Sequence, residues 1–297
     1  MPLLLLPLLP LLLAGAAGCA GDATFQRDSN PVVLLDGPPG SDAGDATPAD
    51  TQPPPREGGS TPDTQPADST PPDQPAGSLV PPAGGSSNGS GGSAADHGKT
   101  RQAGSTSYIL LVPQSYNASK ASRAMVVISG TEGMTVMANN LNGLAGQLGL
   151  GDVIFAVIDG PATFGNGQAC AAVLDDVRAR FNVDNDRTYL LSESAGTRAG
   201  LSLGLSLRQS YFAAYWANDV NASATPAKSA AQLGFSPWGN AGPGGALATA
   251  TAIVNGMKSA GYRLPADAPY SGSGSTQHGN PQQFIAALQF FRDKSRQ

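Results

Sequence analysis

Continuous apolar runs alternate with helical apolar patterns through the C-terminal part of this chain. Five short runs predict β-strands, over residues 108–113, 124–128, 153–158, 188–191 and 211–216. Runs that are apolar at every position, rather than at every second one, are typical of strands covered on both faces. The pattern therefore predicts a mostly parallel sheet with helices on both faces.

The segments between and after these runs carry apolar side chains at helical spacing. Such patterns extend over residues 137–148, 170–181, 196–205 and 247–257. A last helix is predicted to begin after Asn280, a favourable N-cap residue, with Pro281 at its first position. Cys170 falls on the apolar side of its helix, which predicts a buried, unreactive thiol. Strands and helices that alternate in this way predict an α/β fold.

The N-terminal residues have a different composition. Residues 1–18 are apolar and uncharged, but they are too short and too rich in proline to span a membrane. We interpret them as a signal peptide. They end before Cys19 in a pattern similar to the bacterial lipoprotein box, which implies cleavage there and lipidation of the thiol. The protein would then be exported and anchored to a membrane, facing the periplasm or the cell surface. The alternative is an ordinary signal peptide with an incidental cysteine.

Residues 19–100 are rich in Pro, Gly, Ser and Asp and poor in large apolar side chains. Such a segment cannot bury enough surface to offset its ordering entropy, so we predict a disordered linker. The net charge of −5 originates here, because acidic residues outnumber basic ones in this segment. The folded domain is predicted to be residues 101–297, held away from the membrane by an extended, self-repelling tether.

Several kinds of site are missing from the sequence. It has no phosphate-binding loop, no zinc-ligand spacing and no basic–aromatic stripe. We therefore expect no metal, no cofactor and no nucleic-acid partner. Cys19 and Cys170 are the only cysteines, so with Cys19 lipidated no intramolecular disulfide is expected. We expect the protein to be a monomer.

The stretch TYLLSESAGTRAG, residues 188–200, carries the candidate chemistry. Ser194 follows a predicted strand and precedes a predicted helix, which is the context of a catalytic serine on a nucleophile elbow. The usual pattern is G-x-S-x-G, and here Ser192 takes the place of the first glycine. Its Cβ is expected to strain or reshape the turn. A literal G-x-S-x-G at residues 85–89 lies in a Gly/Ser-rich tract without a strand or a helix, so we assign it no chemistry.

These features resemble the α/β-hydrolase superfamily, and within it the secreted esterases of the polyhydroxybutyrate depolymerase and feruloyl esterase type. Three stretches carry the resemblance: VLDDVRARFNVDNDRTYLLSESAG, the opening strand YILLVPQSY and the loop TQHGNPQQF. Together they extend over about residues 105–295. The resemblance implies a serine hydrolase whose substrate is a carboxylic ester.

The resemblance also implies roles for single residues. Ser194 would be the nucleophile and His278, just before the last helix, its base. Two backbone N–H groups would hold the oxyanion, one from Ala195 and one from Thr131. Glu132 lies in the same loop as Thr131, and we interpret it as a loop charge.

The residue that orients His278 stays open between three candidates. Asp219 ends a predicted strand, where some hydrolases place this acid, and it is the one we favour. Asn240 lies where the family usually has a carboxylate, and an amide can also orient an imidazole. Asp267 is the third candidate, with a solvated loop position as its alternative. The altered elbow and the missing carboxylate leave a second hypothesis open, a non-catalytic lipoprotein of hydrolase fold that binds a ligand.

Overall fold

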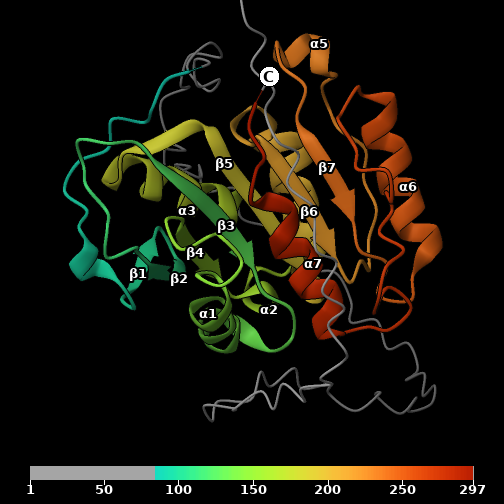
Figure 1. The fold of residues 1–297 in the computed structure, drawn as a ribbon, viewed down its shortest axis with the longest axis horizontal. Helices are drawn as coiled ribbons and strands as arrows, with labels where there is room; N and C mark the ends of the chain where they lie inside the picture. Colours follow the sequence, from blue (N-terminus) through green and yellow to red (C-terminus); the bar gives the residue numbers. More distant parts are fainter. Residues whose placement is uncertain (1–83, 297) are drawn as a thin grey trace, which may run out of the picture. The chain divides into compact units, whose positions relative to one another are not determined.

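A computed structural model describes residues 84–296, so the predictions for residues 1–83, including the signal peptide and Cys19, lie outside the described residues. The strands are β1 (Thr100–Ala103), β2 (Thr106–Leu111), β3 (Ser122–Ile128), β4 (Ile154–Ile158), β5 (Val183–Glu193), β6 (Ala214–Asn218) and β7 (Trp238–Ala241). They form one seven-stranded sheet in the order β1-β2-β4-β3-β5-β6-β7 (Figure 1). The strands from β4 to β7 in this order pair in parallel, and β1 and β2 add an antiparallel hairpin at one edge.

Helices cover both faces of the sheet. The helices are α1 (Gly133–Leu144), α2 (Gly160–Thr163), α3 (Gly167–Arg180), α4 (Thr197–Ser202), α5 (Ala230–Leu233), α6 (Leu247–Ser259) and α7 (Pro281–Phe291). Apolar side chains of α1 and α7 pack into the core on one face, and those of α3, α4 and α6 pack into the core on the other. In Figure 1, α7 accordingly lies in front of β6 and α3 behind β3. The predicted α/β fold with a mostly parallel sheet is confirmed.

The elements that the apolar pattern predicted are all present. Strands β4 and β6 are buried at every position, as continuous apolar runs require. Cys170 on α3 is fully buried. Helix α7 begins where predicted, because the Asn280 side chain accepts a hydrogen bond from the N–H of Gln282 at 2.9 Å. The sequence pattern did not predict β1 or β7, which are short and carry few large apolar side chains.

The predicted boundary between linker and domain is too late in the chain, because residues 84–100 are ordered, lie against the domain and include a short 3₁₀ helix, Ala94–Asp96. The Ser87 hydroxyl donates to the carbonyl of Phe181 at 2.7 Å and accepts from the N–H of Val183 at 2.9 Å. Ser86 also forms an isolated bridge with Asp184 at the start of β5. Within residues 84–296, no helix has the length and apolar character needed to cross a membrane.

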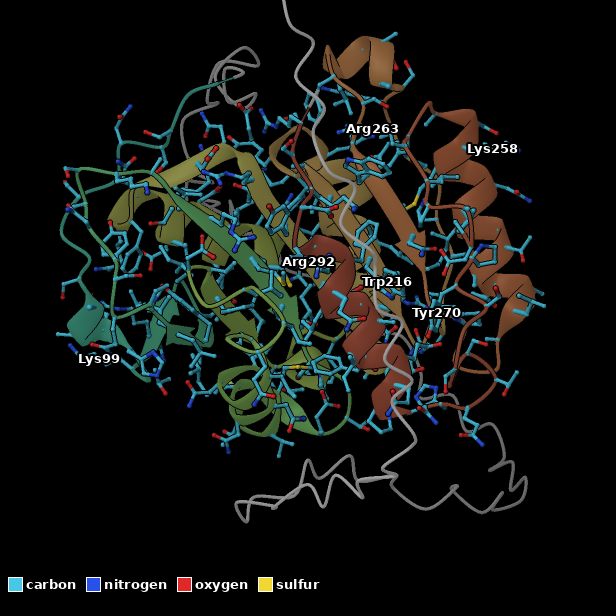
Figure 2. All side chains as sticks on the ribbon, in the orientation of Figure 1. Lys99, Trp216, Lys258, Arg263, Tyr270 and Arg292 are labelled. Carbon is cyan, nitrogen blue, oxygen red and sulfur yellow. The ribbon has the colours of Figure 1, made fainter. Side chains whose placement is uncertain are left out.

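Aromatic packing fixes α7 on the sheet. The ring of Trp216 in β6 lies 5.2 Å from that of Phe290 in α7 and 5.6 Å from that of Tyr270. Trp216 and Tyr270 are labelled beside each other in Figure 2. Because α7 follows directly after the loop of His278, this packing also determines where that histidine lies.

Candidate active site

Ser194 lies on a sharp turn between β5 and α4. Its φ of 44° is in the left-handed region, which residues other than glycine rarely adopt. The turn needs glycine at position 196, because a Cβ there would lie 2.6 Å from both the Ile128 side chain and the carbonyl oxygen of Ser129. A serine on a strained strand-to-helix turn is the geometry of a nucleophile elbow.

The elbow serine contacts a histidine from the other end of the domain. The Oγ of Ser194 and the Nε2 of His278 are 2.8 Å apart, within hydrogen-bonding distance. A serine hydroxyl is a weak nucleophile unless a base at this distance takes its proton. His278 is exposed and Ser194 is half-buried, so the pair is accessible from solvent. The structure thus brings together the two residues that the sequence analysis paired.

Asp219 follows β6 directly and is almost fully buried. Its φ of 46° is also left-handed. Its Oδ2 accepts a hydrogen bond from the N–H of Gly279 at 2.6 Å, and its Oδ1 accepts one from the side-chain amide of Gln283 on α7. Asp219 therefore holds the histidine loop through the residue after His278. Among the described residues, the hydrogen bonds to Asp219 include none from the imidazole.

The other two candidates for orienting the histidine lie elsewhere. Asn240 is buried in β7, where its Oδ1 accepts from the N–H of Ala241 at 2.8 Å. Asp267 is an exposed loop residue. Of the three candidates, Asp219 is the one that the structure bonds to the histidine loop.

The loop after β3 lies against the nucleophile. A Cβ on Gly130 would come within 3.1 Å of the Ser194 Cβ. Thr131 follows Gly130 directly and is exposed. Ala195 is in the first turn of the short 3₁₀ helix at residues 194–196, where N–H groups have no intrahelical partner. Ala195 is thus the residue after Ser194, and Thr131 is the residue after the glycine that packs against Ser194.

Comparisons with known proteins agree with this architecture. No model of a known family matches the chain, and no curated protein does. Among solved structures it is similar to a thermostable esterase, with a TM-score of 0.50 and 14% identity, and the match covers 67% of this chain and 62% of that one. It is also similar to a poly(3-hydroxybutyrate) depolymerase from Bordetella parapertussis (TM-score 0.43, 14% identity, 65% of this chain, 94% of that one). A thermophilic esterase from Thermogutta terrifontis matches with a TM-score of 0.45 and 12% identity, over 65% of this chain and 91% of that one.

The chain has the α/β-hydrolase fold. The order of its chemical groups along the chain, serine then acid then histidine, is the order found in that fold. At these identities the likeness concerns the fold alone.

The fold accommodates a serine at the first glycine position of the elbow. The Ser192 hydroxyl is hydrogen-bonded to the hydroxyl of Tyr215 at 2.9 Å. Its Cβ points at Gly200 of α4, where a side chain would collide with it. The space that the usual glycine leaves on the strand is thus provided on the helix instead.

Two glutamates lie against Gly130, the glycine that packs beside the nucleophile. A Cβ on Gly130 would be 2.5 Å from the Glu132 carboxylate and 3.3 Å from the Glu193 side chain. Glu132 also accepts from the N–H of Gly130 at 2.9 Å. Burial raises the pKa of both glutamates, and the nearby charge of Asp219 raises them further. Glu132, which we interpreted as a loop charge, thus accepts a hydrogen bond from its own loop at the glycine that packs beside Ser194.

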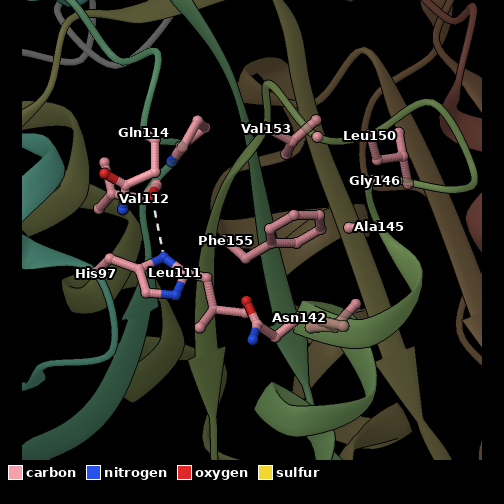
Figure 3. A pocket seen from close by; sticks show the side chains of 13 residues that line it. His97, Leu111, Val112, Gln114, Asn142, Ala145, Gly146, Leu150, Val153 and Phe155 are labelled. Atoms are coloured by element: carbon pink, nitrogen blue, oxygen red, sulfur yellow. Dashed lines mark hydrogen bonds between the residues drawn. The ribbon is translucent and has the colours of Figure 1, made fainter. Parts of the chain in front are cut away.

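His97 is the second histidine of the chain and lies at a different place. Its Nδ1 is 2.9 Å from the carbonyl oxygen of Val112. Figure 3 shows it at the rim of a hollow of about 220 Å³, whose other lining residues include Leu111 and Phe155. Neither Ser194 nor any acidic side chain lines this hollow. Among residues 84–296, no group of three or more His, Cys, Asp or Glu side chains could hold a metal ion.

Proposed function

We propose that this protein is a serine hydrolase that cleaves carboxylic esters. The observation that carries the proposal is the 2.8 Å contact between Ser194 Oγ and His278 Nε2 at a turn where the serine has a φ of 44°. Left-handed backbone at a residue other than glycine costs about 1–3 kcal/mol and is typical of functional sites. An ordinary turn serine needs neither this conformation nor a histidine 84 residues away.

The arrangement supports acylation of the serine. Ser194 Oγ attacks the ester carbonyl carbon while His278 Nε2 takes the hydroxyl proton. The tetrahedral intermediate carries a negative oxygen, which the N–H groups of Ala195 and Thr131 stabilise. The C–O bond to the alcohol then breaks, and His278 returns its proton to the departing alkoxide. The product of this step is an acyl ester on Ser194.

Water completes the reaction by the same route. His278 takes a proton from a water molecule, and the resulting hydroxide attacks the acyl carbonyl. The proton goes back to Ser194 as the carboxylic acid leaves. Asp219 keeps the histidine loop in place through Gly279 in both steps.

The test is labelling of the full chain with a fluorophosphonate probe, which reacts only with activated serines. We expect the wild-type protein to be labelled and the Ser194→Ala and His278→Ala variants to remain unlabelled. Ser271→Ala, an exposed serine in the same loop as His278, and His97→Ala are the matched controls and should label like the wild type.

The alternative outcome defines the second hypothesis. A folded wild-type protein that does not react with the probe would mean that Ser194 is not activated, and the protein would then be a ligand-binding hydrolase fold without turnover. Labelling followed by a screen of carboxylic esters of increasing acyl length would identify the substrate.

We also propose that the protein is exported and anchored through a lipid on Cys19. The small residues Ala16, Ala17 and Gly18 before this cysteine support the proposal. Growth of expressing cells with radiolabelled palmitate should label the wild-type chain but not a Cys19→Ser variant. Equal labelling of the two would overturn it. The proposal is independent of the chemistry at Ser194.

A further inference from the structure

The carboxyl group of Glu193 is held between two neighbours from the end of β6. In the sheet register Glu193 pairs with Asn218, so the residues that follow them leave the sheet side by side. Both carboxyl oxygens of Glu193 accept from the Asn218 amide, at 3.0 and 3.1 Å. That amide cannot turn around, because its oxygen accepts from the indole N–H of Trp216 at 2.9 Å. Asp219 follows Asn218 directly, so its carboxyl group leaves the sheet beside Glu193, and burial together with the charge of Asp219 raises the pKa of Glu193.

Two buried carboxyl groups at adjacent strand ends repel each other when both are ionised, which favours a proton on one of them. Asp219 receives a backbone N–H and a side-chain amide, which both stabilise an ionised carboxylate. Glu193 receives a single amide and is buried. The surroundings therefore place the proton on Glu193 and the negative charge on Asp219.

We propose that Glu193 is a positioning residue, which keeps its proton at neutral pH and donates a hydrogen bond to Asp219. Asp219 then has three donors around its carboxylate, from Glu193, Gly279 and Gln283. These donors fix the orientation of the Asp219 carboxylate. In that orientation the carboxylate also binds the loop of His278 through Gly279. The inference rests on the proposed function only for its effect on activity, because the protonation state of Glu193 can be measured without a substrate.

Besides burial, the acidic groups around Glu193 raise its pKa. Asp219 comes from the end of β6 and Glu132 from the loop before α1, and both carry carboxyl groups. Asp159, at the start of α2, acts on Glu132 in turn. Among the described residues these acidic groups have no lysine or arginine in a salt bridge with them. The titratable base of the site is His278, whose Nε2 is bonded to Ser194.

The first test compares the pH dependence of unfolding for the wild type and Glu193→Gln. A glutamate that stays protonated in the fold binds one more proton in the native state than in the unfolded one. Wild-type stability should therefore fall relative to the variant as the pH rises above about 5, by up to roughly tenfold in the unfolding constant per pH unit. Asp267→Asn, an exposed carboxyl of the same C-terminal region, is the matched control and should not change this dependence. Parallel curves for the wild type and Glu193→Gln would overturn the proposal.

A second test leaves Glu193 itself unchanged. Infrared spectroscopy at neutral pH should show the carbonyl stretch of a protonated carboxylic acid, since exposed acidic residues are ionised there. The band should survive in Glu132→Gln, which removes the other glutamate of the site. A wild-type spectrum without the band, or its complete loss in Glu132→Gln, would contradict the assignment.

The role in positioning has its own measurement. Glu193→Ala should reduce kcat/KM for ester hydrolysis by roughly ten- to a hundredfold, because a hydrogen bond to a charged group is lost. Glu193→Gln should recover most of that loss, since its amide can donate to Asp219 as the protonated acid does. A Gln variant as impaired as the Ala variant would overturn this role. If the wild type itself has no esterase activity, the proposed function fails while the unfolding and infrared tests still decide the protonation of Glu193.

Discussion

Gly200 faces Ser192 so closely that a Cβ at position 200 would lie 2.5 Å from the Ser192 hydroxyl oxygen. The two residues come from consecutive elements, β5 and α4, on either side of the nucleophile. The serine on the strand is compatible with the elbow because the helix has no side chain opposite it. The effect of a substitution at one of these positions therefore depends on the residue at the other.

Gly200→Ala should destabilise the protein by about 2–3 kcal/mol, although alanine usually stabilises a helix relative to glycine. In a Ser192→Gly background the same substitution should cost about 1–2 kcal/mol less, because the opposing side chain is gone. Urea unfolding of the four proteins of this cycle measures the coupling. Gly143→Ala on α1 has open space around it and should stabilise slightly. Additive effects at positions 192 and 200 would show that the two side chains do not compete.

Substitutions at Asp219 should distinguish the effect of its negative charge on activity from the effect of its hydrogen bonds on stability. Asn tolerates a left-handed backbone, so Asp219→Asn should cost about 1 kcal/mol of stability and still lower kcat/KM by roughly 10²–10⁴-fold. Asp219→Ala leaves the donors on Gly279 and Gln283 unpaired and should cost about 3 kcal/mol. Steady-state kinetics and chemical unfolding give the two quantities separately. If Asp219→Asn had the same kcat/KM as the wild type, Asp219 would have no role in the mechanism.

A negative charge at position 283 should destabilise the protein. The Gln283 amide donates to Asp219 and its oxygen accepts from the N–H of Gly244 at 3.1 Å. Gln283→Glu places another buried carboxyl beside Asp219 and should cost about 3 kcal/mol at neutral pH. The cost should decrease as the pH is lowered toward about 5, where the new carboxyl is protonated in the fold. Gln282→Glu, exposed on the same helix, should change stability by less than about 0.5 kcal/mol at either pH.

Cys170 should react only when the protein unfolds. Its side chain is fully buried, and burial raises the pKa of the thiol to about 12. In a Cys19→Ser background it is the only cysteine, so its reaction with a thiol reagent can be followed directly. The reaction rate should follow the fraction of unfolded protein as urea is added. Leu247→Cys in the same background introduces an exposed thiol and should react within the mixing time.

The sequence predicted those parts of the structure that local patterns determine. Long apolar runs identify β3, β4 and β5, and the capping sequence Asn280-Pro281 identifies the start of α7. Ser194 and His278 were found because each lies at a recognisable junction between elements. The same reasoning missed β7, whose Gly239 and Asn240 do not form an apolar run.

What the sequence did not predict depends on side chains that meet across the fold. The partnership of Ser192 with Gly200 depends on how α4 packs on β5. The position of Gln283 beneath Asp219 depends on how α7 docks on β6. We interpreted Glu132 as a loop charge, because nothing near it in sequence shows that the ends of β5 and β6 bring two more carboxyl groups close to it.

The left-handed backbone at both Ser194 and Asp219 links catalytic competence to the integrity of the packed domain. Neither residue favours this conformation by itself, so it persists only while the neighbouring strand ends and helices hold it. Loosening of α4 or α7 lets each backbone return to an ordinary conformation and separates the serine from its histidine. Ester hydrolysis should consequently disappear at a lower urea concentration than the tertiary fluorescence of Trp216.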